Sequence, residues 1–241
     1  MINDLLQRLM AAQTDEERSW IATESLLESL PEDVKSALWA VAVPHWFDAE
    51  ILAALCPELA DLAEEIYRQL QLISCVEVFP ERGHNVHELT RNQLLDRLWK
   101  DNPERFRELS DRVAAYFAQT DRPENQIEWI YQLAVANPDR CINELSDLAN
   151  GWQNTFRRAE LDSLIAFLQM QIRANRTTVA VKAETIYWDG KIKFRFYQAK
   201  EALERYEAAL AFYREIGDRL GEANTLQAIG DVLQWCDQNL M

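Results

Sequence analysis

The stretch EALERYEAALAFYREIGDRLGEA (201–223) decides the fold that this sequence predicts. Ala202, Tyr206 and Ala209 follow one another at helical spacing as small, aromatic and small residues. Small side chains let a second, antiparallel helix approach closely, and the aromatic ring fills the gap beside them. The stretch therefore predicts one helix of a tightly crossed hairpin.

Two glycines outside that stretch extend the pattern in both directions. Gly190 and Gly230 lie 40 residues apart, and each falls inside a predicted helix with bulky neighbours. A fixed spacing of this size is typical of repeat proteins, in which similar helical pairs stack on one another. We therefore expect repeated helical hairpins over about 180–241.

These positions resemble the tetratricopeptide repeat, which has a large residue, a Leu, a Gly and an aromatic on its first helix and then Ala, aromatic and Ala on its second. The matching residues are Ile186, Gly190, Ala202, Tyr206 and Ala209 in one repeat, and Leu226, Ile229, Gly230 and Leu233 in the next. Asp189 and Lys193 depart from the pattern, and the repeat is longer than the usual length of about 34 residues.

The second repeat contains only its first helix in this sequence, so an apolar face along 226–233 is expected to lack its usual cover. We consider two explanations. Either the sequence belongs to a longer array, or this face docks on another molecule, including a second copy in a homo-oligomer.

Composition limits the partners. Forty acidic and 25 basic residues among 241 give a formal net charge of -15, which disfavours nucleic acid and anionic membranes. Only six glycines and seven prolines are present, which favours long helices. Four scattered cysteines form no CxxC motif, and neither a signal peptide nor an 18-residue apolar run is found, so we expect a cytoplasmic protein without membrane contact.

The first half, 1–120, is predicted to be helical with one interruption. Thr14-Asp15-Glu16-Glu17 resembles a helix start, with acids near the positive end of the helix dipole, and Asp48 is expected to be a helix N-cap. Strands are expected at 73–79 and 85–89, joined by the turn Pro80-Glu81-Arg82-Gly83. Helices are expected at 4–12, from 15 onward, 32–43, 49–56, 59–72, 90–99 and 103–119.

The region of about 33–100 resembles the winged-helix segment that precedes the repeats of bacterial STAND-class signalling NTPases. The residues that carry this are LWAVAVPHWFDAEILAAL (38–55), CVEVFPERGHNVHEL (75–89) and TRNQLLDRLW (90–99), followed by the helix at 105–117. No G-x-x-x-x-G-K-[ST] motif is present, so the NTPase core is absent. The resemblance implies a relay or sensor arm of such a signalling protein without its NTPase core.

Beyond residue 121, helical stretches alternate with short breaks. They are predicted at 124–136, 139–149, 152–157, 159–174, 178–196, 198–216 and 219–236. Within them, the segment Lys191-Ile-Lys-Phe-Arg-Phe-Tyr197 alternates bases with apolar residues. Lys191, Lys193, Arg195 and Tyr197 are our candidate partner-binding residues, and the alternative is that these bases are merely solvated.

The sequence contains little that indicates a catalytic site. His84, His87 and Glu88 are the one cluster that could suggest a metal, but the two histidines fall on opposite faces of a strand. No GxSxG motif occurs. We therefore expect no enzyme activity, no cofactor and no metal site.

Our prediction is an all-α protein with one short β-hairpin: a winged-helix-like part (1–120) and an α-solenoid (121–241). Its function would be to bind a protein or peptide as a scaffold or sensor arm of a signalling system. A winged-helix DNA-binding regulator is the first alternative, and its bases would be Arg68 on 59–72 or Arg91, Arg97 and Lys100 around 90–100. A hydrolase with an unrecognised site is the second.

Overall fold

The protein is described by a computed structural model that places residues 2–239, with side chains for 6–238. It is an all-α protein with one short β-hairpin, as the sequence predicts: the described part contains thirteen α-helices, one 3-10 helix and a two-stranded sheet. The chain forms two compact units, Met1–Tyr116 and Phe117–Met241, where the sequence suggested a boundary at 120. Each unit is described by itself below.

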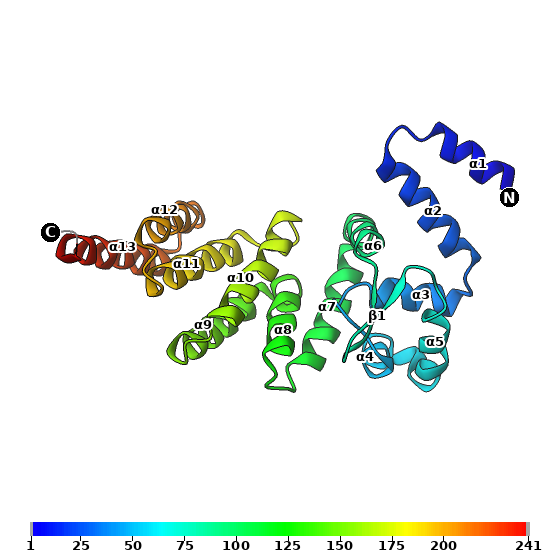
Figure 1. Ribbon diagram of the computed structural model, residues 1–241, viewed down its shortest axis with the longest axis horizontal. Coiled ribbons are helices and arrows are strands. Elements are labelled where there is room, and N and C mark those ends of the chain that lie inside the picture. The colour runs from blue at the N-terminus through cyan, green and yellow to red at the C-terminus, as the bar shows by residue number, and fades with distance from the viewer. Residues whose placement is uncertain (1, 240–241) are drawn as a thin grey trace. The chain divides into compact units, whose positions relative to one another are not determined.

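The first unit contains seven α-helices and the hairpin (Figure 1). In chain order its elements are α1 Ile2–Ala11, α2 Asp15–Ser29, α3 Glu32–Val41, α4 Ala49–Leu55, the 3-10 helix η1 Pro57–Leu62, α5 Ala63–Leu70, β1 Val76–Phe79, β2 Gly83–Val86, α6 Glu88–Asp101 and α7 Pro103–Phe117. The predicted helix start at Thr14 and the predicted N-cap at Asp48 are confirmed. The Thr14 side chain accepts from the Glu17 N–H, and Asp48 accepts from the Ile51 N–H.

The hairpin is shorter than the sequence suggested. β1 begins at Val76 and not at Ile73, and β2 covers 83–86 and not 85–89. The two strands are antiparallel, with Phe79 opposite Gly83. Gly83 has a φ of +94°, and a Cβ there would collide with the Phe47 carbonyl oxygen. A third segment therefore joins the hairpin through backbone bonds between Phe47 and His84, and this tertiary contact sets where β2 begins.

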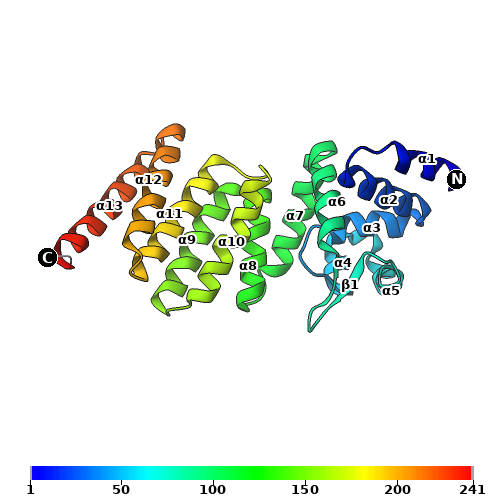
Figure 2. The same ribbon diagram turned by 45° about the horizontal axis from the view of Figure 1, so that its top comes forward.

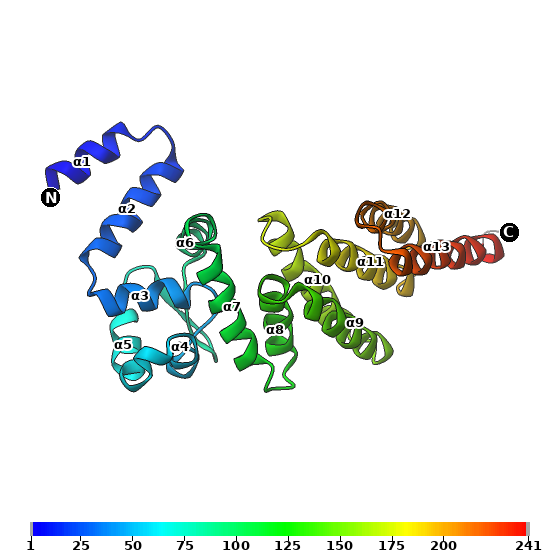
Figure 3. The ribbon, with the colours of Figure 1, turned by 180° about the vertical axis from the view of Figure 1, so that it is seen from behind.

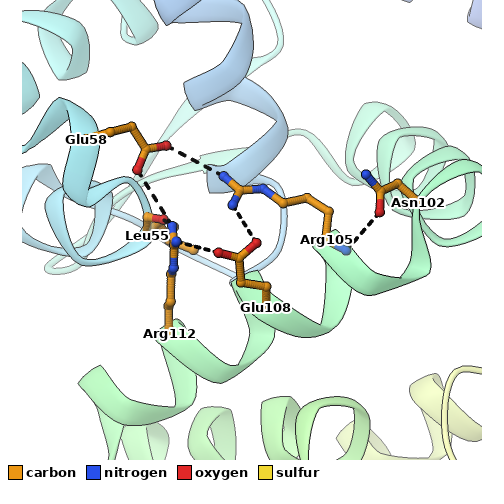
Figure 4. Close-up of polar contacts among 6 residues, drawn as sticks. All are labelled: Leu55, Glu58, Asn102, Arg105, Glu108 and Arg112. Carbon is orange, nitrogen blue, oxygen red and sulfur yellow. Dashed lines mark hydrogen bonds and ion pairs between the residues drawn. The ribbon is translucent and has the colours of Figure 1, made fainter.

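The helix expected at 59–72 is wrong over 59–62, where the chain forms η1 before α5 begins at Ala63. Contacts with α7 hold this connection (Figure 4). Glu58 lies 3.7 Å from Arg105 and 3.8 Å from Arg112, and Glu108 pairs with the same two arginines. Arg112 also donates to the Leu55 carbonyl oxygen at 2.6 Å, which satisfies a carbonyl at the end of α4.

The second unit consists of stacked helical hairpins (Figure 2). Its elements are α8 Pro123–Ala136, α9 Pro138–Asn154, α10 Arg158–Arg173, α11 Val179–Arg195, α12 Ala199–Ile216 and α13 Arg219–Asn239. Consecutive helices contact each other, and α8 also lies against α10 while α9 lies against α11. Seen from behind, α12 lies next to both α11 and α13 (Figure 3).

One predicted break in this unit is absent. The sequence suggested separate helices at 139–149 and 152–157, but α9 runs without interruption to Asn154. Gly151 lies on the exposed side, and nothing lies within 4 Å of the place where its Cβ would be. Because Ala149 and Trp152 are buried on the other side, packing of that face keeps the helix intact across the glycine.

Candidate functional site

The crossing of α11 and α12 is built around Gly190. A Cβ on this glycine would lie 2.7 Å from the ring of Tyr206, so only glycine allows the observed approach. Ala202 and Ala209 are fully buried on α12, and Ile186 packs against the cluster that contains Ala209. The first repeat therefore has the close helix contact that its small residues predict.

The same helix makes a second close contact that the sequence reading missed. A Cβ on Gly221 of α13 would collide with the ring of Tyr213 on α12. Gly217 already ends α12 in the left-handed conformation, with a φ of +72°. Gly221, four residues later, has no role in that turn. A second glycine so close to the first was therefore a sequence signal that Gly221 serves helix packing.

The crossing expected at Gly230 is not found. No heavy atom lies within 4 Å of the place where its Cβ would be, and no described helix covers this face of α13. Leu226 and Leu233 are 46% and 50% exposed, and Ile229 is partly buried. The apolar face along 226–233 therefore lacks its usual cover among the described residues, as expected, and the close helix contact that the glycine itself suggested is not found.

A carboxylate fixes the relative positions of three helices. Glu184 of α11 accepts hydrogen bonds from Ser146 of α9 at 2.8 Å, from the Trp188 indole at 2.9 Å and from the Tyr213 hydroxyl of α12 at 2.6 Å. Burial raises the pKa of the Tyr213 hydroxyl, and the adjacent Glu184 carboxylate raises it further. This network makes the helical stack rigid beside the cavity described next.

A cavity of about 500 Å³ opens beside α11 and α13, with contributions from α9 and α12. Its lining combines aromatic rings, side-chain amides and three charged groups. These residues are Gln153, Tyr187, Lys191, Phe194, Arg195, Tyr197, Tyr206, Asn224, Gln227, Ala228, Asp231 and Trp235. Concave sites lined by rings with a few polar groups are the usual form of binding sites, and this is the candidate site of the second unit.

Three of the four candidate partner-binding residues line the cavity, and one does not. Lys191, Arg195 and Tyr197 all lie in its wall. Lys193 lies instead 4.0 Å from Asp189, an acid that Arg205 of α12 also binds at 2.7 Å. Residues two apart on a helix point in different directions, whereas residues four apart share a face. Lys191 and Arg195 therefore line the cavity together, and Lys193 does not.

Both cations of the cavity rest on aromatic rings. The Lys191 ammonium lies 3.9 Å from the centre of the Trp188 ring, and the Arg195 guanidinium lies 4.8 Å from that of Phe156. Burial lowers the pKa of Lys191, although Glu184 opposes this shift. Among the described residues, no carboxylate lies within ion-pair distance of either cation. They are therefore held in place by aromatic rings and not by ion pairs.

The mouth of the cavity carries exposed aromatic surface. Tyr197 has a φ of +64°, an uncommon value for a tyrosine, and its side chain is 78% exposed. Its ring lies 6.2 Å from that of Trp235, which also makes an edge contact with Phe194. The turn after α11 thus places a tyrosine at the entrance, where sequence periodicity alone would not put it.

Several residues that the DNA-binding and metal-binding alternatives would use in the first unit bind elsewhere in the chain. Arg91 is buried and donates to the carbonyl oxygens of Val43 and Pro44, and Arg97 lies over the Trp20 ring at 4.5 Å. Two of the three bases that α6 was expected to offer to DNA are thus engaged within the chain. His84 bonds to the Tyr67 hydroxyl at 2.7 Å, whereas His87 lies 4.0 Å from Glu77 and makes no side-chain cap for α6.

The described residues contain no group of three or more histidine, cysteine or acidic residues arranged to hold a metal ion. None of their helices combines the length and apolar character that a membrane crossing requires. Comparison of the chain with protein-family models, with curated proteins and with solved structures finds no match.

Proposed function

We propose that this chain is a non-catalytic protein-binding module whose cavity beside α11 and α13 receives a segment of a partner protein. The observation that carries the proposal is the pair of cations without an ion pair, Lys191 and Arg195, in an aromatic cavity of about 500 Å³. Aromatic and arginine side chains in desolvated pockets dominate the energetics of protein interfaces.

The lining indicates what the partner segment contains. The rings of Phe194, Tyr197 and Trp235 offer contact to an apolar or aromatic side chain. Lys191 is partly desolvated before binding, so an acidic group that enters beside it meets a cation that has already lost part of its hydration. A segment that carries an apolar residue next to an acidic one matches both features.

The helical stack supports binding without major rearrangement. The hydrogen bonds of Glu184 and the close approach at Gly190 hold α11 against its neighbours. A preformed cavity loses little conformational entropy when it binds, so more of the contact energy remains as affinity.

The wider setting is part of the same proposal. The repeat positions around Gly190 and the order of helices, hairpin and helices in the first unit support kinship with tetratricopeptide proteins and with the winged-helix and repeat region of STAND-class NTPases. On this proposal the protein acts in the cytoplasm as a scaffold or sensor arm that recognises a signalling partner.

Capture of partners with the full chain as bait tests the function. The informative variants are Lys191→Ala and Tyr197→Ala, and the matched control is Lys182→Ala. Lys182 is also a cation over a ring on α11, 4.1 Å from the centre of Phe212, but it does not line the cavity. Partners bound through the cavity should lose at least about tenfold in affinity with either cavity variant and keep it with the control.

The opposite pattern would contradict the proposal. If the captured proteins bind wild type, Lys191→Ala and Tyr197→Ala equally in a purified assay, the cavity is not the binding site. Circular dichroism of each variant confirms that loss of binding does not reflect loss of fold.

A further inference from the structure

The cavity beside α11 and α13 contains a carboxylate as well as its two cations. Lys191 and Arg195 come from α11, whereas Asp231, the one carboxylate among the lining residues, comes from α13. Asp231 is exposed and makes no ion pair among the described residues. The cavity therefore presents positive and negative charge from two different helices, and the proposed function uses only the positive charge.

The charge of Asp231 acts on the interior of the cavity. Burial raises the pKa of the Tyr187 hydroxyl, and the carboxylates of Glu184 and Asp231 raise it further. Burial also raises the pKa of Tyr206, and Tyr187 and Asp231 add to this shift. Both tyrosines line the cavity, so the Asp231 carboxylate lies close to its interior surface.

Asp231 lies one helical turn before Trp235. Residues four apart share a face of a helix, and both of these residues line the cavity. The centre of the Trp235 ring lies 6.2 Å from those of Phe194 and Tyr197. A positive group that binds the Asp231 carboxylate therefore meets aromatic rings at the same place. A carboxylate and the face of an aromatic ring both attract lysine and arginine side chains.

The same unit shows how an acid and a tryptophan four residues apart hold a cation. Glu184 and Trp188 have this spacing on α11, and the Trp188 indole donates to the Glu184 carboxylate at 2.9 Å. The Lys191 ammonium lies 3.9 Å from the centre of the Trp188 ring, and Glu184 raises its pKa against the effect of burial. Asp231 and Trp235 repeat the acid and the ring, but no described cation pairs with this carboxylate.

We propose that Asp231 and Trp235 form a subsite for a lysine or arginine side chain of the partner segment. The inference rests on the proposed function, in which Lys191 and Arg195 bind an acidic group of the same segment. The cavity then selects a segment that carries both an acidic and a basic residue, and the positions of the two charges fix the direction in which the segment lies. Asp231 is the residue that determines specificity for the basic side chain.

Selection of peptides on the full chain tests this inference. The probe is a phage-displayed library of random peptides. Peptides selected on the wild type should be enriched in acidic residues and in lysine or arginine. Asp231→Asn should remove the enrichment of basic residues and keep that of acidic ones, whereas Lys191→Ala should lower the enrichment of acidic residues alone. Asp237→Asn is the matched control, because Asp237 is an exposed acid of α13 that does not line the cavity.

Charge reversal provides the second readout. A peptide selected on the wild type is labelled with a fluorophore, and fluorescence anisotropy measures its affinity for the full chain. Asp231→Lys should weaken binding at least about tenfold, and so should a change of the critical basic residue of the peptide to glutamate. The two changes together should restore most of the affinity, which a merely structural role of Asp231 would not do. Circular dichroism confirms that each variant keeps its fold.

The outcomes separate this inference from the proposed function. The inference fails alone if Lys191→Ala lowers the enrichment of acidic residues while Asp231→Asn leaves that of basic residues unchanged. It also fails alone if the paired charge reversal recovers no affinity. If no peptide is selected, or if Lys191→Ala and Asp231→Asn both leave the selected peptides unchanged, the proposed function fails and the inference fails with it.

Discussion

Gly190 and Gly230 hold equivalent places 40 residues apart, yet one is enclosed and the other is open. Around Gly190 the ring of Tyr206 comes so close that a methyl group would not fit, whereas around Gly230 no atom lies within 4 Å of the same point. The side chains around each glycine give the helix a surface of similar shape. Whether that surface is a core or an interface depends on the helix that follows it.

The largest effect is expected from Gly190→Ala. The new methyl group would lie 2.7 Å from the Tyr206 ring, and that ring is almost fully buried and cannot move away. We expect a loss of about 3 kcal/mol in unfolding free energy, at the upper end of the range for overpacked cores. Hydrogen exchange of peptides from α11 and α12 measures this locally, and unchanged protection there would refute the close crossing.

Next in size is Tyr213→Phe, which leaves one oxygen of Glu184 without its hydrogen-bond donor. A hydrogen bond to a charged group is worth about 1.5–3 kcal/mol, so the stack of α9, α11 and α12 should weaken by about that amount. Tyr187→Phe removes a hydroxyl that takes no part in the bonds to Glu184 and is the control. Equal effects of the two changes would show that the network adds nothing.

The same tyrosine predicts a pH dependence. Burial raises the pKa of Tyr213 in the folded state, so its contribution to stability is complete below the unfolded pKa of about 10 and is lost as pH rises above it. One such group gives a slope of up to about 1.4 kcal/mol per pH unit. Urea unfolding between pH 9 and 11 should show this slope, and Tyr213→Phe should reduce it. Tyr187 and Tyr206 have pKa values raised in the same direction and account for a remaining slope.

The counterpart to the first prediction is Gly230→Ala, which should stabilise the protein. The added methyl group enters open space, and alanine is favoured over glycine in a helix interior by about 1 kcal/mol. Slower hydrogen exchange in α13 is the expected readout. A destabilised α13 would mean that Gly230 is already in contact with something, and the contrast with Gly190 would be lost.

The smallest effect is expected from Arg205→Ala at the rim of the enclosed crossing. The ion pair with Asp189 is short, but Arg205 is half exposed, so solvent and salt screen it. We expect a loss below about 1 kcal/mol that shrinks further in 1 M salt. A larger, salt-independent loss would indicate that Arg205 stabilises the crossing through packing of its aliphatic part and not through its charge.

Local chemistry explains why much of the fold was predictable. The caps at Thr14 and Asp48, the helix hairpins beyond residue 121 and the stripe around Gly190 all depend on residues near one another in sequence. The candidate cavity was predictable only in part. Lys191, Arg195 and Tyr197 were found from the unusual composition of residues 191–197, but Gln153, Asp231 and Trp235 reach the same cavity from other helices.

By itself, the sequence determined the helical class, the hairpin in the first unit and the small residues at which helices can cross, because spacing along a helix fixes which side chains share a face. Tertiary structure alone decided that η1 forms beside Arg105 and Arg112, that β2 begins at Gly83, and that residues of α9, α12 and α13 join Lys191 in one cavity. It also decided that Gly190 is covered and Gly230 is not. These outcomes depend on atoms far apart in the chain, and a linear pattern records the shape of a face but not what comes to lie against it.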